Sequence, residues 1–586
     1  MRFFPKAALA KITVLGIAAF APSITALAQS SPIITYNSQF HPTLAKTGMV
    51  VSQEHFASEA GLEILKAGGN AVDAAVATGF ALAVTHPQAG NLGGGGFMMV
   101  YLKDQDKTIA IDYREMAPAA AYRDLFIGED GEVDRRKAMF SLKSSGTPGS
   151  VKGLVEALEK YGTLPLAQVM APAIKLAEEG FPMPWALQDS LKRYGRRLKN
   201  NPTSLAYFYK EGGAPYQWGD VFAQPDLAKT LRAIAENGSD GFYKGWVADK
   251  IVSTMEAGAG LITLEDLANY KVRYREPIVG TFRDVKIVTM PPPSSGGIHI
   301  VQMLNVLEGW DLKELGHNSA QYIHRMSETM KYAYADRSKY LGDPDFFKVP
   351  SKALTSKEYG ASIRGKINLK KATPSTEISP AASLPEESND TTHFSVVDRF
   401  GNMVANTYTL NFTYGNSISV AGAGFLLNNE MDDFSAKPGT QNAFGLLGGE
   451  ANAIEAGKRP LSSMTPTLVF KDGKPWFATG SPGGSRIITT VLQVILNVAE
   501  FDMNIQAATN FPRFHHQWFP DQIFVETGIS IDTRRALAAM GQNIDVKTKD
   551  GESKVLGAAM SIMITPDGTL LGAADPRRPG SHAAGY

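Results

Sequence analysis

The chain has 586 residues, which is long enough for a large core and for more than one structural unit. Its 58 Lys and Arg balance its 58 Asp and Glu, so the charge points neither to nucleic acid nor to an anionic membrane as a partner. The sequence contains no Cys, which excludes disulfides, thiolate metal sites and a cysteine nucleophile.

The first 28 residues have the pattern of a secretory signal peptide. A basic start is followed by an uncharged run over residues 12–20 and by an Ala-x-Ala pattern at 26–28. A membrane anchor would need about 20 apolar residues, and Pro22 interrupts the run early. We therefore expect cleavage after Ala28, a mature protein without a membrane anchor, and a periplasmic or secreted location.

Helical periodicity opens the mature chain. Residues 53–84 read as two Ala-rich helices separated by two glycines, with Asn70 as the N-cap of the second. A glycine run at 93–96 comes next and precedes a strand over 97–102. No Gly-Lys-Ser/Thr follows this run, so the pattern favours tight backbone packing under a pocket over a phosphate loop.

A second strand, over 108–113, ends at Arg114. Arginine at a strand end is either a surface salt-bridge residue or a group that holds a carboxylate through two parallel hydrogen bonds, and these residues alone leave both open. Further helical patterns predict a layer of helices on a sheet rather than a site. The predicted helices span 151–161, 166–179, 185–198, 225–236, 242–257, 298–307 and 320–341.

The sequence carries no motif for a metal or a cofactor. Histidines occur singly except for His515 and His516, and adjacent residues cannot both chelate from one regular element without distortion. HExxH motifs and carboxylate clusters at ligand spacing are absent from the sequence, so we expect neither a metal nor a cofactor.

The middle of the chain changes abruptly from a polar segment to a β-hairpin. Residues 366–390 are rich in Pro, Ser, Glu and Ala and show no apolar periodicity, which predicts a flexible tether. Two alternating strands follow, and Gly401 between them suits the left-handed position of a short hairpin loop.

The register of this hairpin determines whether two threonines lie opposite each other. If Asp398 pairs with Asn402, Thr391 lies directly across from Thr409, so that two hydroxyl groups meet where the tether ends. A Ser/Thr-rich linker between two domains is the commoner explanation of such residues.

Polar loops follow the hairpin. Glu430 and Asp433 are three residues apart, so a helical turn would bring them together as an acidic focus, and a solvated loop is the alternative. Residues 438–449 have the Gly-rich, polar composition of a mobile lid.

A glycine pair lies between the last predicted strand, over 475–479, and a helix over 487–500. Gly483 and Gly484 would expose backbone N–H groups at the positive end of the helix dipole. Such a position suits an anion or an oxyanion.

Several segments, taken together, carry a resemblance to a known family. They are residues 112–118 (DYREMAP), 390–395 (DTTHFS), 407–411 (TYTLN), 428–435 (NNEMDDFS), 459–464 (RPLSSM) and 480–486 (GSPGGSR). From about Gly48 to Tyr586 the chain resembles the γ-glutamyltransferases (γ-glutamyl transpeptidases) of the bacterial type, which are N-terminal nucleophile hydrolases. The order and length of these motifs make the resemblance specific.

The resemblance implies a four-layer αββα sandwich that is made as a proenzyme and cuts itself before a threonine. In this sequence the bond would be Asp390–Thr391, which gives a large subunit of residues 29–390 and a small catalytic subunit of residues 391–586 that form a heterodimer. Glutathione and other γ-glutamyl compounds would be the donors, and amino acids, peptides or water the acceptors.

The resemblance also implies roles for individual residues. Thr391 would be the nucleophile, with Thr409 bonded to its hydroxyl and the N–H groups of Gly483 and Gly484 as the oxyanion hole. The implied ligands of the donor are Arg114, Ser462 and Ser463 for the α-carboxylate, and Asp433, Glu430 and Asn411 for the α-ammonium.

One position departs from the family pattern, and two other functions remain open. Many bacterial members have tyrosine where this chain has Phe444 in the lid, so we expect substantial hydrolysis beside transfer. A glutaryl β-lactam acylase would use Thr391 similarly, but its donor lacks the amine that Glu430 and Asp433 would bind. The other function is that of an exported protein that binds glutamyl compounds without turnover.

Overall fold

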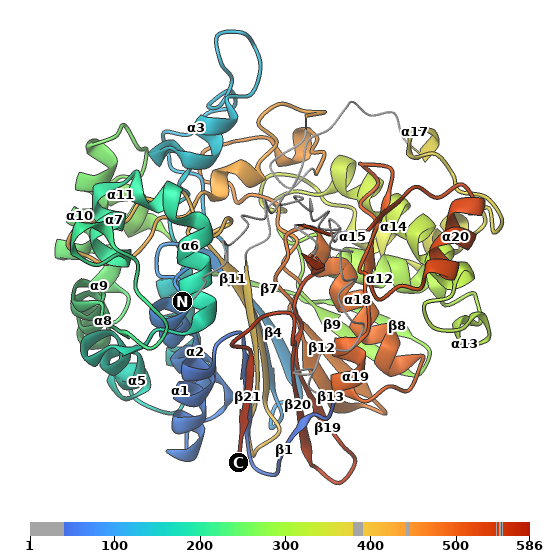
Figure 1. The fold of residues 1–586 in the computed structure, drawn as a ribbon, viewed down its shortest axis with the longest axis horizontal. Coiled ribbons are helices and arrows are strands. Elements are labelled where there is room, and N and C mark those ends of the chain that lie inside the picture. Colours follow the sequence, from blue (N-terminus) through green and yellow to red (C-terminus); the bar gives the residue numbers. More distant parts are fainter. Residues whose placement is uncertain (1–39, 379–390, 441–445, 547, 550–551, 554) are drawn as a thin grey trace, which may run out of the picture.

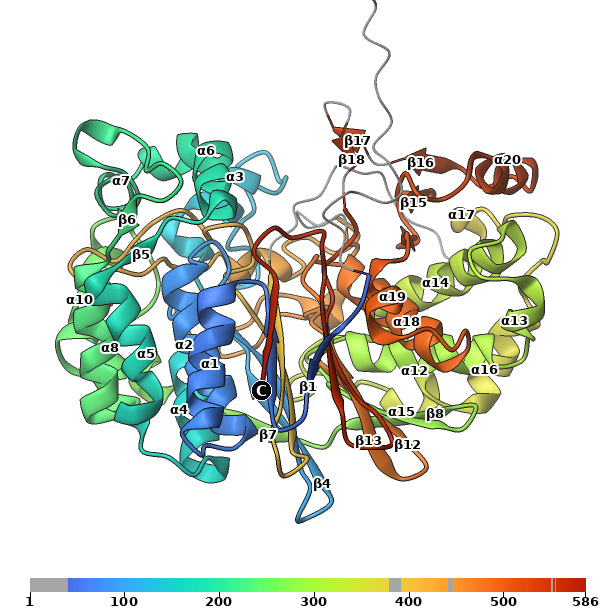
Figure 2. The ribbon, with the colours of Figure 1, turned by 60° about the horizontal axis from the view of Figure 1, so that its bottom comes forward.

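Two antiparallel sheets lie face to face at the centre of the molecule, and helices cover the outer face of each (Figures 1 and 2). The computed structural model describes residues 40–378, 391–440, 446–546, 548–549, 552–553 and 555–586. The predicted αββα sandwich is confirmed. The expected signal peptide, Asp390 and Phe444 lie outside the described residues.

Each main sheet has seven strands. The first runs in the order β21 (His582–Gly585), β2 (Met49–Ser52), β10 (Thr392–Val397), β11 (Met403–Thr409), β3 (Gly95–Leu102), β4 (Lys107–Tyr113) and β7 (Arg273–Arg275). The second runs in the order β1 (Thr43–Ala45), β20 (Leu570–Ala574), β19 (Met560–Ile564), β13 (Lys474–Thr479), β12 (Thr467–Lys471), β9 (Val285–Thr289) and β8 (Ile278–Phe282).

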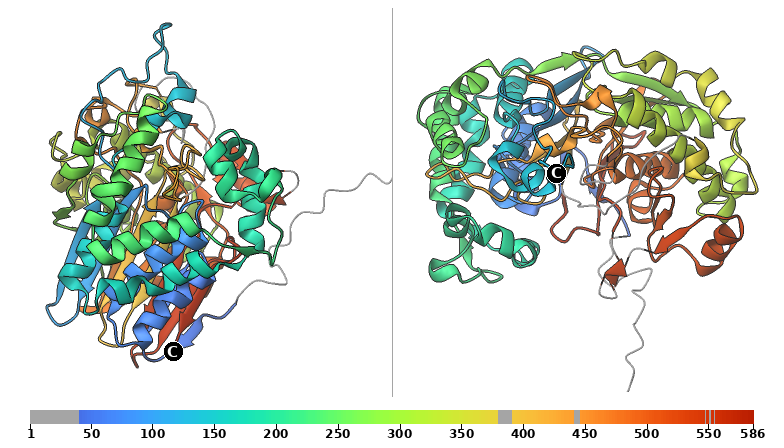
Figure 3. Two further views of the ribbon diagram at one scale, coloured as in Figure 1. Left: turned by 90° about the vertical axis from the view of Figure 1, so that its left-hand side faces the viewer. Right: turned by 90° about the horizontal axis from the view of Figure 1, so that it is seen from above.

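Two groups of helices form the outer layers, as the view from above in Figure 3 shows. The first group comprises α1 (His55–Lys66), α2 (Ala71–Thr85), α3 (Arg135–Phe140), α4 (Ser150–Tyr161), α5 (Leu166–Glu179), α6 (Trp185–Lys199), α7 (Pro202–Phe208), α8 (Pro225–Asn237), α9 (Asp240–Tyr243), α10 (Gly245–Glu256) and α11 (Leu264–Asn269). The second comprises α12 (Gly296–Leu307), α13 (Leu312–Leu315), α14 (Ala320–Tyr340), α15 (Ser351–Leu354), α16 (Lys357–Arg364), α17 (Ser375–Ile378), α18 (Arg486–Ala499), α19 (Ile505–Asn510) and α20 (Ile531–Ala539).

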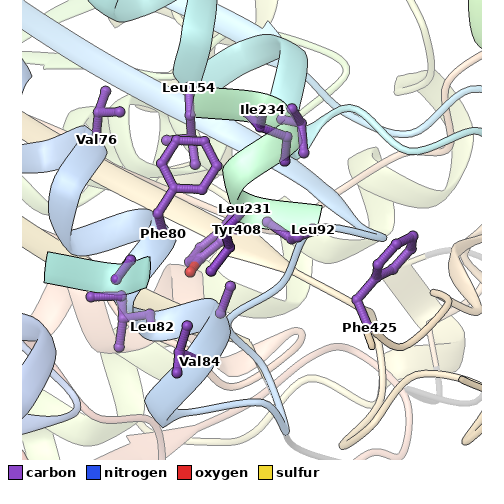
Figure 4. Packing of buried hydrophobic residues seen from close by; sticks show 14 of the residues in the cluster. Val76, Phe80, Leu82, Val84, Leu92, Leu154, Leu231, Ile234, Tyr408 and Phe425 are labelled. Carbon is purple, nitrogen blue, oxygen red and sulfur yellow. The ribbon is translucent and has the colours of Figure 1, made fainter. Parts of the chain in front are cut away.

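Successive side chains of the central strands point to opposite faces of the sheet and so belong to two hydrophobic cores. Met98 and Val100 of β3 pack toward the first helix layer, whereas Phe97 and Met99 pack toward the second sheet. Figure 4 shows part of the first core, where Phe80 of α2 and other apolar side chains lie between the helices and one face of the sheet. Burial on both faces explains why these strands are continuously apolar.

The second Ala-rich helix begins as the sequence predicts. The side chain of Asn70 accepts hydrogen bonds from the N–H groups of Val72 and Asp73, and the Asp73 carboxylate accepts from the N–H of Asn70. This capping box satisfies donors that the first turn leaves without helical partners. The predicted helix over 242–257 is wrong in one respect, because Gly245 adopts φ +64° and divides it into α9 and α10.

The glycine run at 93–96 provides close packing, as expected. A Cβ atom added to Gly94 would lie 2.0 Å from the carbonyl oxygen of Thr409, and one added to Gly96 would lie 2.4 Å from the Tyr408 Cβ. Only glycine lets β3 approach β11 this closely at the end of the hairpin.

The flexible tether does not begin at residue 366. Ile367 is buried, and the N–H of Ala372 donates to the carbonyl of Met540 at 2.7 Å. Ser375 donates its hydroxyl to the carbonyl of Trp518 and accepts from the indole N–H of the same residue. The prediction is therefore wrong for 366–378, because these contacts fix a segment that its polar composition alone marks as solvated. Residues 379–390 lie outside the described residues.

Candidate active site

The central hairpin places Thr391 beside Thr409. Thr392 pairs with Tyr408 and Val397 with Met403, so the predicted register is confirmed. Gly401 has φ +83°, the left-handed conformation expected in the turn. The Oγ1 atoms of the two threonines lie 3.4 Å apart, and both side chains are buried.

A cleft opens at this end of the hairpin. It brings together most of the predicted site residues: Arg114, Thr391, Thr409, Asn411, Glu430, Asp433, Ser462, Ser463 and Gly484. Among the described residues, its lining also includes Arg337, Leu446, Met464, Ser485 and Ile487. Gly483 precedes a lining residue but does not itself line the cleft.

Arg114 lies at the end of β4 and is buried, so the surface salt bridge considered from the sequence is wrong. Its backbone N–H donates to Asp112 Oδ1 at 3.0 Å, which fixes the strand end. The guanidinium donates to the carbonyl of Pro460 at 3.2 Å, to Glu430 Oε1, and to Asp433 Oδ2 at 2.5 Å. A fork that reaches two carboxylates is held in one orientation.

The acidic focus is real; Glu430 is buried and Asp433 is partly exposed. Glu430 and Asp433 belong to a single 3-10 turn, Glu430–Asp433, and the solvated loop is wrong because Glu430 is only 1% exposed. Glu115 is fully buried beside them, with an oxygen 3.7 Å from the Arg114 guanidinium. Three carboxyl groups therefore surround one guanidinium.

Burial raises the pKa values of these three acids. Burial raises the pKa of Glu115 to about 7 against the opposing effect of Arg114, and burial also raises the pKa of Glu430 well above its usual value. The pKa of Asp433 is raised for the same reason. A buried cluster with more acids than adjacent cations favours a positively charged ligand.

Two serines form another wall of the cleft. The N–H of Ser462 donates to the carbonyl of Pro293 at 2.8 Å, and the carbonyl of Ser462 accepts from the N–H of Ser295 at 2.8 Å. The hydroxyl of Ser463 accepts from an Nη2 of Arg337 at 3.4 Å. A loop ahead of α12 and a side chain of α14 thus position these hydroxyls.

Glu115, Ser295 and Arg337 were not predicted as site residues. Glu115 follows Arg114 directly in the sequence, so its place in that motif was an available signal. Arg337 gives no such signal, because α14 is a largely buried helix and one arginine among its buried residues is not distinguished by spacing.

Gly483 and Gly484 lie where β13 ends and α18 begins. Their φ angles are +131° and +55°, which glycine adopts without strain. A 14-residue helix follows, so the positive end of its dipole faces this turn. Among the described residues, no group of three or more His, Asp or Glu side chains is arranged to hold a metal ion.

Two face-to-face antiparallel sheets with a buried threonine at the start of a central strand, beside a charged cleft, define an N-terminal nucleophile hydrolase. Residues 57–585 match the model of the family described as gamma-glutamyltranspeptidase. The chain belongs to this family.

Individual relatives agree with this assignment. The chain is 55% identical over 565 residues to a glutathione hydrolase proenzyme of Escherichia coli (strain K12), with 96% of each chain covered. It is 46% identical to a glutathione hydrolase proenzyme of Pseudomonas sp. (strain A14), with 93% of this chain and 95% of that one covered. The crystal structure of cephalosporin acylase from Bacillus halodurans superposes with a TM-score of 0.82 at 29% identity, covering 97% of this chain and 99% of that one.

Proposed function

We propose that this protein is a self-cleaving γ-glutamyltransferase and glutathione hydrolase. It transfers the γ-glutamyl group of glutathione and related amides to amino acids, peptides or water, through an ester on Thr391. The observation that carries this proposal is a single cleft in which the Thr391 hydroxyl lies with a buried arginine and buried carboxylates. That arrangement suits a donor with both a carboxylate and an ammonium group.

Self-cleavage would generate the nucleophile. The Thr391 hydroxyl attacks the carbonyl carbon of Asp390, the peptide C–N bond breaks, and water hydrolyses the resulting ester. The products are a carboxylate at Asp390 and a free amine on Thr391, whose pKa near 8 makes it a usable base. Residues 29–390 and 391–586 would remain together as a heterodimer, exported by the signal peptide to the periplasm or the medium.

The cleft offers separate positions for the two charged ends of the donor. Arg114 and the hydroxyls of Ser462 and Ser463 would bind the α-carboxylate, and Glu430 and Asp433 the α-ammonium. In the unliganded cleft Arg114 forms ion pairs with both of these acids. A zwitterion can therefore enter by exchanging one set of ion pairs for another, without leaving a buried charge unpaired.

Asn411 would complete the ammonium site. Its Nδ2 donates to the carbonyl of Asn429 at 3.0 Å, which leaves Oδ1 as the atom that accepts from an ammonium group.

The acyl transfer then needs one proton acceptor and one oxyanion site. As the Thr391 oxygen attacks the γ-carbonyl carbon, its proton passes to the Thr391 amine, while Thr409 holds the hydroxyl in position. The N–H groups of Gly483 and Gly484 would stabilise the oxyanion, each at about 3 kcal/mol. The leaving amine takes the proton, and water or an acceptor amine later attacks the ester.

A β-lactam acylase is the second candidate, since a cephalosporin acylase shares the fold. The buried acids argue against it, because a glutaryl donor brings no cation to Glu430 and Asp433. Hydrolysis rates of γ-glutamyl and glutaryl p-nitroanilides discriminate the two. The proposal expects a strong preference for the γ-glutamyl compound and, after acid quench, one glutamyl group on the peptide that begins at Thr391. A preference for the glutaryl compound would favour the acylase, and no turnover of either would favour a binding protein.

A further inference from the structure

The overall balance of acidic and basic residues conceals one strongly basic segment. Residues 190–210 contain six basic residues and no acidic one. The segment includes most of α6 and all of α7, which lie at the edge of the first helix layer (Figure 2). A basic amphipathic helix is typical of proteins that bind at a membrane surface. The six residues are Lys192, Arg193, Arg196, Arg197, Lys199 and Lys210.

One side of α6 packs on the protein and the other side is exposed. Lys192, Arg196 and Lys199 are exposed and lie three or four residues apart, so they share one face of the helix. Among the described residues, no carboxylate pairs with Lys192 or Arg196, and Lys199 donates to the carbonyl of Gly213 at 3.0 Å. The buried residues of the inner side are Leu187, Leu191, Gly195 and Leu198.

Two nearby acids offset part of the charge of the segment. The carboxylates of Asp189 and Asp220 lie 2.7 Å from Arg193 and 2.6 Å from Lys210, respectively. The three exposed cations on the outer face of α6 therefore keep their charge for a partner outside the molecule.

Two exposed tryptophans border this face. Trp185 begins α6 and is 50% exposed, and Trp218, in the loop before β6 (Val221–Phe222), is 74% exposed. A hydrogen bond of 3.0 Å from Gln188 Nε2 to Gln217 Oε1 holds that loop beside the first turn of α6. Val221 is also 65% exposed. Single exposed apolar side chains are ordinary, but a group that includes two tryptophans indicates a contact surface.

We propose that the outer face of α6, together with Trp185 and Trp218, binds the surface of a lipid bilayer that contains anionic lipids. The basic side chains attract the phosphates of the lipid head groups. The tryptophan rings have an apolar body and a polar N–H group, which suits the boundary between head groups and acyl chains. Because the leucines of α6 stay packed on the protein, the helix lies along the bilayer surface.

A bilayer fits this surface better than a dissolved polyanion does. The bilayer offers head groups to the cations and an interfacial layer to the tryptophans, whereas a polyanion such as heparin would engage only the cations. The two partners therefore differ in whether the tryptophans contribute to binding.

The test is cosedimentation of the purified protein with sucrose-loaded vesicles. We expect binding to an equal mixture of phosphatidylcholine and phosphatidylglycerol and not to phosphatidylcholine alone, and release at about 1 M salt, where charges are screened within ~3 Å. The double variant Lys192→Glu/Arg196→Glu should lower the partition coefficient by roughly tenfold or more. Trp218→Ser should lower it by about threefold or more, because the ring no longer enters the interface.

Lys370→Glu/Lys371→Glu is the matched control. Both lysines are exposed and lie between α16 and α17, in the second helix layer, so the control changes the net charge by the same amount at another place. It should bind the anionic vesicles as the wild type does. Undiminished binding by Lys192→Glu/Arg196→Glu, or an equal loss in the control, would overturn the inference.

Two further measurements complete the test. Lipids brominated in the acyl chain should quench the fluorescence of the wild type more than that of Trp218→Phe, and equal quenching would overturn the inference. So would binding to heparin without binding to the anionic vesicles. Vesicle binding needs no turnover, and the α6 variants should keep the wild-type rate on γ-glutamyl p-nitroanilide and the wild-type melting temperature. The inference and the proposed function therefore fail independently of each other.

Discussion

The hydroxyl oxygens of Thr391 and Thr409 lie 3.4 Å apart at the end of a hairpin that runs through the centre of its sheet. The Thr409 hydroxyl also accepts from the N–H of Asn411 at 2.9 Å. The N–H of Asn411 thus fixes the Thr409 hydroxyl, and the Thr409 hydroxyl in turn orients that of Thr391.

Replacing Thr409 should affect the chemical step and not donor binding. We expect Thr409→Ala to slow self-cleavage and to lower kcat by roughly ten- to a hundredfold, because the Thr391 hydroxyl loses its partner. KM for γ-glutamyl p-nitroanilide should stay close to wild type. Thr409→Ser keeps the hydroxyl and should retain most of the rate, and an equally slow Thr409→Ser would contradict the role of the hydroxyl.

Glu115 should make stability depend on pH. Its pKa is raised by burial from 4.5 to about 7, so between these values the folded protein holds a proton that the unfolded chain has lost. The bound proton contributes ~3 kcal/mol to the folding free energy at low pH, and this contribution is therefore lost as the pH rises through this range.

Glu115→Gln removes this titration. Melting temperatures of the wild type and variant, measured from pH 4.5 to 8, should diverge in favour of the variant as the pH rises. A difference that stays constant across this range would contradict the assignment.

Arg114 should matter for both stability and donor binding. Arg114→Met leaves the buried Glu430 and the partly exposed Asp433 without their adjacent cation, which should cost about 3–5 kcal/mol of folding free energy. We expect KM for γ-glutamyl p-nitroanilide to rise by roughly tenfold or more, because the α-carboxylate loses its cation. Arg114→Lys restores a charge but not the fork and should be intermediate in urea denaturation. Wild-type stability of Arg114→Met would contradict the ion pairs.

Residue 444 should affect how the glutamyl ester on Thr391 divides between hydrolysis by water and transfer to an acceptor amine. The composition of residues 438–449 predicts a lid, and a tyrosine at position 444 would add a hydroxyl to it, so Phe444→Tyr should lower hydrolysis relative to transfer. Assays with and without glycylglycine measure the ratio. Strict dependence of the wild type on glycylglycine would contradict the expected hydrolysis.

The central hairpin could be predicted from sequence because its geometry is local. A turn at Gly401 sets the register, and the register alone places Thr391 across from Thr409. The roles expected of Arg114, Glu430 and Asp433 come from the family resemblance, since contacts between residues 316 or 319 positions apart leave no local pattern.

Other features could not be predicted, for the same physical reason. Arg337 reaches the cleft from a helix whose spacing indicates only burial. The segment through Ser375 looks solvated by composition, yet Trp518 holds it through hydrogen bonds from a distant part of the chain. Both depend on tertiary contacts and not on periodicity.

Intact-mass analysis of the Thr391→Ala variant, paired with an assay of glutamate release from glutathione, tests the central claim most directly. Thr392→Ala is the matched control, because the neighbouring hydroxyl has no hydrogen-bond partner among the described residues. We predict that the wild type and Thr392→Ala give two chains, the smaller beginning at residue 391, and release glutamate. Thr391→Ala should remain one inactive chain, and its maturation into two chains with normal glutamate release would contradict the account.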